Sequence, residues 1–309
     1  MSCVCITGGA GFIGSHIASV FKSQGDEVVV IDDLSSGSKE NLESGIKLYE
    51  LDIRSEECQK VLKEIKPDIL IHTAAQVSVS KSMNNPKFDA DVNIMGLLNI
   101  LNAFDSESLP YLVFISTGGA MYGEQEEFPA TEEHPAFPTS FYGLSKKVSE
   151  LYLELWHNTF GLNYATLRLA NVYGPKQNPH GEAGVVAIFY DKLLQGEEAV
   201  IYGDGEQTRD YVYVEDVASA VNAAVKSNAN GIFNIGTSIE TSVNHLYSLV
   251  TDILGSSKKA NMAPQRAGEQ RRSAISASKA KEILNWEPKK DVEQGLKETA
   301  EWFKSKHTH

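Results

Sequence analysis

The sequence predicts an α/β fold with a doubly wound parallel sheet. Apolar runs alternate with longer helical patterns, and these runs lie at residues 3–6, 28–31, 47–51, 69–72, 112–115 and 165–169. This regular β-α-β order is typical of parallel strands that are covered by helices on both faces. A glycine-rich turn joins the first apolar run to the first helical pattern, which is a second observation in favour of this fold class.

Residues 7–14 form that turn and read TGGAGFIG. Glycines let the backbone approach a pyrophosphate, and the free amides at the start of a helix receive its charge. The second strand ends in Asp32, eighteen residues past Gly14, where a carboxylate that binds a ribose is expected. The pattern therefore predicts a dinucleotide site. Asp32 and the neighbouring Asp33 favour NAD over NADP, because a 2′-phosphate would meet their negative charge.

Further along the chain, the ends of two strands carry residues suited to a ligand site. The fourth strand leads into residues 73–76, which read TAAQ and suit a loop that passes close to a ligand. The fifth strand ends in Ser116 and Thr117, and ligands bind at the carboxyl ends of strands in open α/β sheets. Between them, Asn93 lies inside a helical pattern at 89–104. It either faces solvent or bends the helix and holds a catalytic water.

After residue 170 the regular alternation gives way to shorter elements. We expect a short strand at 200–202, a strand at 232–235 that returns to the sheet, and helices at 185–194, 243–254, 278–284 and 292–304. The sequence thus predicts two parts. The first is a dinucleotide-binding domain over residues 1–170, to which 212–237 return, and the second is a smaller substrate-binding lobe over 171–211 and 238–309.

Composition limits the classes of partner. The 309-residue chain carries 28 Lys and Arg against 41 Asp and Glu, a net charge of −13 that argues against nucleic-acid binding. Of six arginines only Arg54 lies in the first half, so the others either hold an anion in the second half or serve solubility.

The three cysteines, Cys3, Cys5 and Cys58, lack the spacing of metal ligands, and we predict no metal site. No apolar run reaches membrane length and no leader pattern precedes the first strand, so we expect a cytoplasmic protein without a membrane partner.

Tyr142 and Lys146 stand four residues apart at the start of a long helical pattern, so they share one helix face. A tyrosine loses its proton near pH 10, and a neighbouring ammonium in a half-buried cleft favours the charged form. The pair therefore predicts a tyrosinate base for a hydroxyl proton. An ordinary surface Tyr and Lys on an amphipathic helix is the alternative.

With the glycine turn, Asp32, Ser116-Thr117 and Tyr142-x-x-x-Lys146 in this order, the chain resembles the extended short-chain dehydrogenase/reductases, which have a Rossmann-type domain. Within them it is most similar to the UDP-hexose 4-epimerases. The resemblance runs almost end to end and includes DGEQTRDY at 204–211 and FNIG at 233–236.

The resemblance implies NAD as cofactor and a UDP-sugar as substrate. Tyr142 would take the proton of the sugar 4-hydroxyl, and Thr117 would share that hydrogen bond, with Ser116 as the alternative because the family's third hydroxyl falls on Gly118. Lys146 would lower the pKa of the tyrosine and hold the nicotinamide ribose. The implied cofactor residues are Gly8, Gly11, Phe12, Ile13, Gly14, Asp32, Asp33, Asp52, Ile53, Ala74, Ala75, Gln76, Asn93, Tyr142 and Lys146.

The implied substrate residues are Ser116, Thr117, Asn171, Val186, Tyr202, Arg209, Arg266, Glu269 and Ser273. Glu269 stands where the family more often has Asp. Ser273 stands where a bulky tyrosine often lies beside the sugar's C2 substituent, so the serine implies that N-acetylated sugars fit. A position on a surface loop is the alternative for Ser273.

Related activities leave other marks in the sequence. The nucleotide-sugar dehydratases, which this chain also resembles, place Asp-Glu directly after the threonine that ends the fifth strand, where this chain has Gly118 and Gly119. Glucuronate epimerases place an arginine where Asn178 stands. A non-catalytic dinucleotide sensor is a further alternative, although such relatives usually lose the Tyr-x-x-x-Lys pair. The family is commonly dimeric, and apolar residues on more than one face of helices 89–104 and 142–160 predict a homodimer here.

Overall fold

A computed structural model of the protein describes residues 1–180, 184–265 and 270–307. Its centre is a seven-stranded sheet in which every pairing is parallel. In spatial order the strands are β11 (Gly231–Ile235), β6 (Tyr164–Leu169), β5 (Tyr111–Thr117), β4 (Ile69–His72), β1 (Cys3–Thr7), β2 (Glu27–Asp32) and β3 (Lys47–Glu50). The strand order reverses between β1 and β4, which is where open α/β sheets bind ligands.

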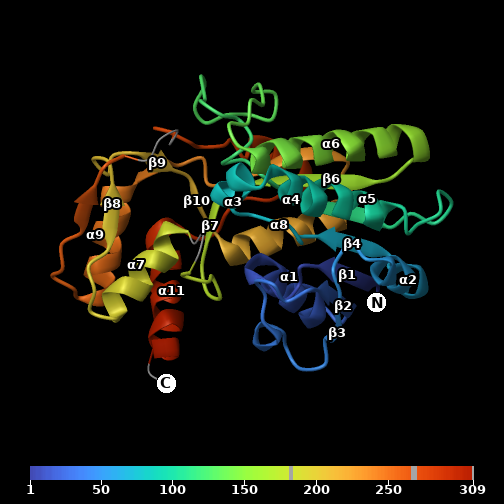
Figure 1. The fold of residues 1–309 in the computed structure, drawn as a ribbon, viewed down its shortest axis with the longest axis horizontal. Helices are drawn as coiled ribbons and strands as arrows, with labels where there is room; N and C mark the ends of the chain where they lie inside the picture. The colour runs from blue at the N-terminus through green and yellow to red at the C-terminus, as the bar shows by residue number, and fades with distance from the viewer. Residues whose placement is uncertain (181–183, 266–269, 308–309) are drawn as a thin grey trace.

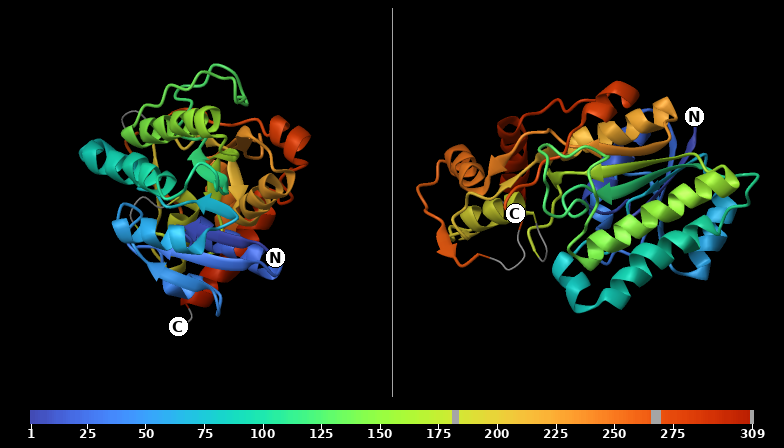
Figure 2. Two further views of the ribbon diagram at one scale, coloured as in Figure 1. Left: turned by 90° about the vertical axis from the view of Figure 1, so that its right-hand side faces the viewer. Right: turned by 90° about the horizontal axis from the view of Figure 1, so that it is seen from above.

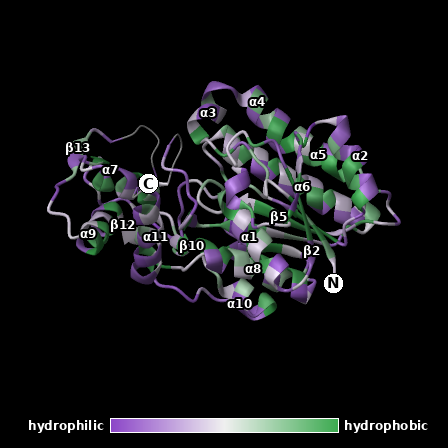
Figure 3. Ribbon diagram, turned by 90° about the horizontal axis from the view of Figure 1, so that it is seen from below, coloured by the Kyte–Doolittle hydropathy of each residue, from purple (hydrophilic) through white to green (hydrophobic). Residues whose placement is uncertain are grey.

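Helices cover both faces of the sheet, as the alternation predicts. One face carries α1 (Phe12–Ser23), α8 (Val214–Ser227) and α10 (Ser278–Leu284), and the other carries α2 (Glu56–Ile65), α5 (Gly96–Leu101) and α6 (Phe141–Phe160). In the right-hand view of Figure 2, α6 in green and α8 in orange lie on opposite sides of the strands. Successive strand residues point to opposite faces, so Val4 and Ile6 join one hydrophobic core and Cys5 joins the other. Figure 3 shows this apolar character of the strands between the helices.

The second part of the chain forms a lobe with its own core, on the left of Figure 1. It contains α7 (Val185–Leu194), β8 (Val200–Tyr202), α9 (Val243–Leu254), β13 (Asn261–Ala263) and α11 (Val292–His307). The segment that includes α10 belongs to the same predicted lobe by sequence. In space it packs on α8 and β11, and Ala280, Leu284 and Trp286 contribute to the core over the sheet.

Short strands connect the two parts and were not predicted. β7 (Asn171–Tyr173) pairs in parallel with β10 (Tyr211–Tyr213), and β9 (Thr208–Arg209) pairs antiparallel with β12 (Thr241–Ser242). The short helices η1 (Lys39–Asn41) and α3 (Val79–Asn84) were also not predicted.

The helix expected at 89–104 is a composite. It consists of α4 (Pro86–Ala90), a π-helical turn η2 (Asp91–Met95) and α5, which ends at Leu101. Asn93 lies in the π-helical turn and is buried, so the solvent-facing alternative is wrong. Its side chain instead bonds the backbone of Gln76 and the hydroxyl of Ser145, at 2.8 to 3.0 Å.

Within the described ranges, no helix is both long enough and apolar enough to cross a membrane. The described part of the chain also holds no group of three or more acidic, His or Cys side chains that could bind a metal ion.

Candidate active site

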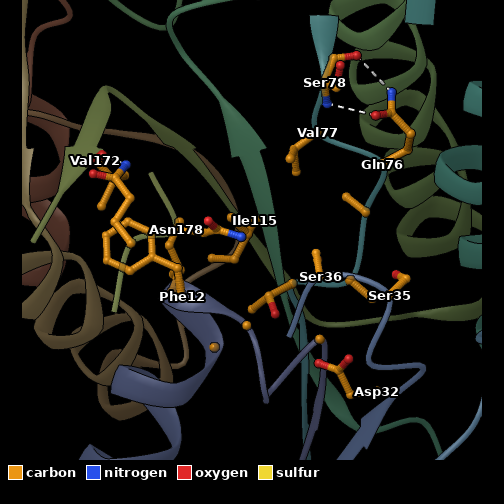
Figure 4. A pocket seen from close by; sticks show the side chains of 18 of the residues that line it. Phe12, Asp32, Ser35, Ser36, Gln76, Val77, Ser78, Ile115, Val172 and Asn178 are labelled. Atoms are coloured by element: carbon orange, nitrogen blue, oxygen red, sulfur yellow. Dashed lines mark hydrogen bonds between the residues drawn. The ribbon is translucent and has the colours of Figure 1, made fainter. Parts of the chain in front are cut away.

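A cavity of about 860 Å³ lies at the carboxyl ends of the central strands and extends toward the second lobe. Figure 4 shows side chains from the start of α1 (Phe12), the end of β2 (Asp32) and the loop after β4 (Gln76) around it. The predicted cofactor residues other than Asn93 all line it: Gly8, Gly11, Phe12, Ile13, Gly14, Asp32, Asp33, Asp52, Ile53, Ala74, Ala75, Gln76, Tyr142 and Lys146.

The glycine turn leaves no room for side chains. Gly8 has φ +70°, and a Cβ on it would lie 2.6 Å from the backbone nitrogen of Ala74. A Cβ on Gly14 would collide with the backbone oxygen of Gly8. Helix α1 starts directly after Gly11, which offers no side-chain cap to the first amides. A bare backbone cradle at a helix N-terminus fits a dinucleotide pyrophosphate.

Acidic side chains stand at the ends of the next two strands. Asp32 is buried, and its two carboxylate oxygens accept hydrogen bonds from the backbone nitrogens of Ala10 and Leu34, each at 2.9 Å. Burial raises the pKa of Asp32, against the lowering effect of those two bonds. Asp52 pairs with Arg54 over 2.5 Å, and this pairing lowers the pKa of Asp52. Asp32 therefore has a fixed orientation at the cavity, as a ribose-binding carboxylate requires.

Tyr142, Thr117 and Lys146 come together at the end of β5. Helix α6 begins at Phe141, where the hydroxyl of Ser140 accepts a hydrogen bond from the backbone nitrogen of Gly143 at 3.1 Å. This places Tyr142 in the first turn, where the hydroxyl of Thr117 acts on its phenol and lowers the pKa of Tyr142. Lys146 follows one turn later; it is buried and also lines the cavity.

The pKa values of Tyr142 and Lys146 differ from the prediction. We expected Lys146 to lower the pKa of Tyr142, but burial raises that pKa to about 12, against the lowering effect of the Thr117 bond. Burial also lowers the pKa of Lys146 to about 8, opposed by the charges of Glu150 and Asp89. The prediction that lysine lowers the pKa of this phenol is therefore wrong, because burial has the largest effect on that pKa and the charge of Asp89 raises it further.

The structure distinguishes the two hydroxyls at the end of β5. Ser116 donates a hydrogen bond to Oε1 of Glu150 at 2.6 Å, and Glu150 in turn pairs with Arg168 at 2.7 Å in the protein interior. The hydroxyl of Thr117, in contrast, acts on Tyr142 and lowers its pKa. A Cβ on Gly118 would lie 2.7 Å from Cδ1 of Ile275, so a third hydroxyl residue there would require the Ile275 side chain to shift.

Several predicted residues lie outside the cavity lining. Asn93 packs behind it, where it links the loop after β4 to α6. Asn171, Val186, Tyr202, Arg209 and Ser273 lie beyond the lining on the side of the second lobe. Arg266 and Glu269 fall outside the described residues.

Sequence reasoning missed other residues that line the cavity. Ser35, Ser36 and Ser38 follow β2, and this run of small polar residues directly after the acidic pair is a signal that could have been used. Trp302 and Lys306 reach the cavity from α11, near the end of the chain. Both residues lie in an amphipathic helix, and nothing in its sequence pattern indicates a ligand-binding site.

The sheet order, the glycine cradle and the Thr117, Tyr142 and Lys146 group define a short-chain dehydrogenase/reductase of the extended type. Residues 4–236 match the NAD dependent epimerase/dehydratase family. The chain belongs to that family.

Relatives and solved structures agree with this assignment. A putative UDP-glucose 4-epimerase of Methanocaldococcus jannaschii is 42% identical over 302 residues, which is 98% of each chain. The UDP-glucose 4-epimerase of Thermotoga maritima, solved with UDP-glucose, is 45% identical and superposes with a TM-score of 0.96 over 98% of this chain and 99% of that one. The UDP-glucose 4-epimerase of Thermus thermophilus, solved with NAD, is 40% identical with a TM-score of 0.91 over 97% and 98%.

Proposed function

We propose that the protein is an NAD-dependent 4-epimerase that interconverts UDP-glucose and UDP-galactose through a transient 4-keto sugar, as a step of galactose metabolism. The observation that carries this proposal is that Thr117, Tyr142 and Lys146 line one cavity, with Lys146 one helical turn after Tyr142. The similarity to UDP-glucose 4-epimerases over almost the whole chain supports the choice of reaction.

In this reaction Tyr142 accepts the proton of the sugar 4-hydroxyl and later returns it. Thr117 shares the hydrogen bond and holds the phenol toward the sugar, while the charge of Lys146 stabilises the phenolate as it forms. The 4-keto sugar turns within the site between the two proton transfers, so that its other face meets the same groups. NAD, when bound, supplies the acceptor and then the donor of the hydride at sugar C4.

The residues that would hold this cofactor are those of the described cavity. The turn from Gly8 to Gly14 would hold the pyrophosphate, and Asp32 would bind the adenosine ribose. Lys146 would hold the nicotinamide ribose. On the side of the second lobe, Asn171 and Arg209 would hold the UDP-sugar.

Other activities of the family fit the site less well. Elimination of water by a dehydratase needs an acid and a base directly after Thr117, where Gly118 and Gly119 have no side chain to supply them. A uronate needs a cation for its carboxylate, and at the position where related enzymes carry an arginine this cavity is lined by Asn178. A UDP-sugar whose hexose carries no charge is therefore the better substrate.

N-acetylated UDP-sugars form part of the proposal. Ser273 is buried, so its side chain belongs to the interior between the two parts rather than to a surface loop. By the family resemblance this position would lie beside the sugar, where a serine leaves more space than a tyrosine would. The proposed substrates therefore include UDP-N-acetylglucosamine and UDP-N-acetylgalactosamine.

A cytoplasmic homodimer completes the proposal. On α6 the side chains of Leu151 and Leu155 are 55% and 58% exposed, and Met95 on the adjacent η2 is 54% exposed. These residues, which we call the α6 patch, are apolar and lie on two neighbouring elements, as a helical dimer interface requires. The free thiols of Cys3, Cys5 and Cys58 fit a reducing compartment.

An NMR assay with UDP-galactose and no added NAD tests the function. New anomeric signals of UDP-glucose are expected from the parent protein, because the cofactor is restored in each cycle. Tyr142→Phe should reduce turnover about 10²–10⁴-fold while NAD and UDP still bind, since only the base is lost. No conversion by the parent, or a Tyr142→Phe variant within tenfold of it, contradicts the proposal.

A further inference from the structure

Asp210 lies where three segments with predicted substrate residues meet. Its backbone nitrogen donates a hydrogen bond to the oxygen of Ser273, and its backbone oxygen accepts one from the nitrogen of Asn171, each at 2.9 Å. Arg209 directly precedes it in the chain. Asn171, Arg209 and Ser273 are far apart in sequence, yet the backbone of this one residue sets their relative register.

The side chain of Asp210 holds a further loop in place. Its Oδ1 accepts hydrogen bonds from the backbone nitrogen of Thr237 at 2.9 Å and from the hydroxyl of Thr237 at 2.6 Å. Its Oδ2 accepts from the nitrogens of Ser238 at 3.1 Å and Ile275 at 3.5 Å. The carboxylate is therefore an acceptor at both oxygens, and asparagine could not replace it without placing an N–H₂ group against N–H donors.

Burial and packing indicate that this arrangement is rigid. Asp210 is 1% exposed, and a Cβ on Gly236 would collide with its Oδ2. Ser238 has φ +64°, and its hydroxyl donates to the oxygen of Ile275 at 3.1 Å. The loop at 236–238 is thus joined to residues 273–275 both through Asp210 and directly.

We infer that Asp210 is a positioning residue for the nucleotide-sugar, which aligns Asn171, Arg209 and Ser273 by joining their segments to the loop at 236–238. The inference rests on the proposed function, because it takes the UDP-sugar as the ligand of those three residues. Asp210 itself has no place in proton transfer. Its effect is on binding of the UDP-sugar and not on the Thr117, Tyr142 and Lys146 group, which lies on β5 and α6.

Asp210→Asn tests this inference in the full-length protein. Because one acceptor oxygen is lost and a donor takes its place, the Kd for UDP in calorimetry and the KM for UDP-galactose should rise about tenfold or more. The kcat and the NAD content should stay within about threefold of the parent values, since the hydrogen bonds of Asp210 go to residues 171, 237–238 and 273–275.

Asp216 provides a matched control. It is also a buried aspartate, and it accepts hydrogen bonds from the backbone nitrogens of Lys289 and Lys290, each at 3.1 Å. These bonds hold the chain before α11 against the start of α8, away from the three substrate residues. Asp216→Asn should lower the Tm while the Kd for UDP stays within threefold of the parent value.

A milder variant guards against misfolding of Asp210→Asn. Thr237→Val removes the hydroxyl donor to Oδ1 and keeps the backbone donor, so a rise of about threefold in the Kd for UDP is expected. If both Asp210→Asn and Thr237→Val lower the Tm and leave the Kd and KM unchanged, as expected of Asp216→Asn, Asp210 is only structural and the inference is overturned. A parent protein that binds UDP without epimerising UDP-galactose contradicts the proposed function alone. One that binds no UDP contradicts this inference.

Discussion

Lys146 donates a hydrogen bond to the backbone oxygen of Ile115 over 2.9 Å. Its ammonium also lies 4.6 Å from the ring centroid of Phe114, so two neighbouring residues of β5 hold the Lys146 side chain in place. Ile115 is two residues before Thr117, and Lys146 is one helical turn after Tyr142. A single strand end and a single helix turn therefore position all three groups of the proposed catalytic site.

The Thr117 hydroxyl should contribute to turnover and the Ser116 hydroxyl should not. Thr117→Val removes the hydroxyl that acts on Tyr142. A hydrogen bond from this hydroxyl is worth roughly 0.5–1.5 kcal/mol, so kcat should fall by about tenfold or less. Ser116→Ala is the matched control, because that hydroxyl bonds Glu150 instead. Steady-state kinetics with UDP-galactose measure both, and a larger loss in kcat for Ser116→Ala would contradict the assignment.

The pH dependence of turnover should report the charge on Lys146. Burial lowers its pKa to about 8, so turnover should fall as the pH rises through about 8 and the ammonium is lost. The charged and titratable groups around it are Glu150 on α6, Asp89 on α4 and His72 on β4. The negative charge of Asp89 raises the pKa of Lys146, and it also raises that of Tyr142.

Asp89→Asn should therefore move the alkaline limb of kcat/KM to lower pH. The asparagine oxygen can still accept the bonds that Asp89 receives from Gln76 and Asn93, at 2.8 and 3.2 Å, so the network keeps its shape. A pH profile of the variant beside the parent checks this. A uniform loss of activity with an unmoved limb would show that Asp89 acts through structure alone.

Sugar choice should depend on Ser273. Ser273→Tyr should abolish turnover of UDP-N-acetylglucosamine and spare that of UDP-galactose, because the larger side chain takes the space of the acetamido group. The ratio of the two kcat/KM values is the measurement. Equal loss of both activities, or a parent protein inactive on the N-acetylated sugar, would count against this role.

NAD should bind more tightly than NADP. The buried carboxylate of Asp32 and the adjacent Asp33 repel a 2′-phosphate, and the difference in Kd should exceed about tenfold. Calorimetric titration of cofactor-free protein measures both constants. Equal affinities would mean that the ribose lies elsewhere.

The α6 patch should hold a dimer together. Light scattering at micromolar protein should give twice the chain mass of 33.8 kDa. Lysines in place of Leu151 and Leu155 should shift the mass toward the monomer, because two charges would be buried in an apolar interface. Ile283→Lys is the control, since Ile283 is also exposed but lies on α10, across the sheet. A monomeric parent would refute the interface.

Local sequence patterns determined most of the fold. The β-α-β alternation predicted the parallel sheet, and the strand at 232–235 was correctly expected to return to it as β11. Helix α7 has the predicted bounds, and α6 begins at Phe141, so that Tyr142 and Lys146 stand at its start as predicted. These features depend on neighbours within one or two turns, so they can be read from the chain itself.

The tertiary structure decided what depends on distant parts of the chain. The pairing of β7 with β10 joins residues about forty positions apart, and no periodicity in either segment predicts this pairing. The sequence left open whether Ser116 or Thr117 acts on Tyr142. In the structure Ser116 donates its hydroxyl to Glu150, which is paired with Arg168, and this leaves Thr117 for Tyr142. The raised pKa of Tyr142 also depends on distant parts of the chain, because burial is its main cause. Desolvation sums over every atom packed around a group, so the four-residue spacing predicted that Tyr142 and Lys146 line the same cavity but not the pKa of the phenol.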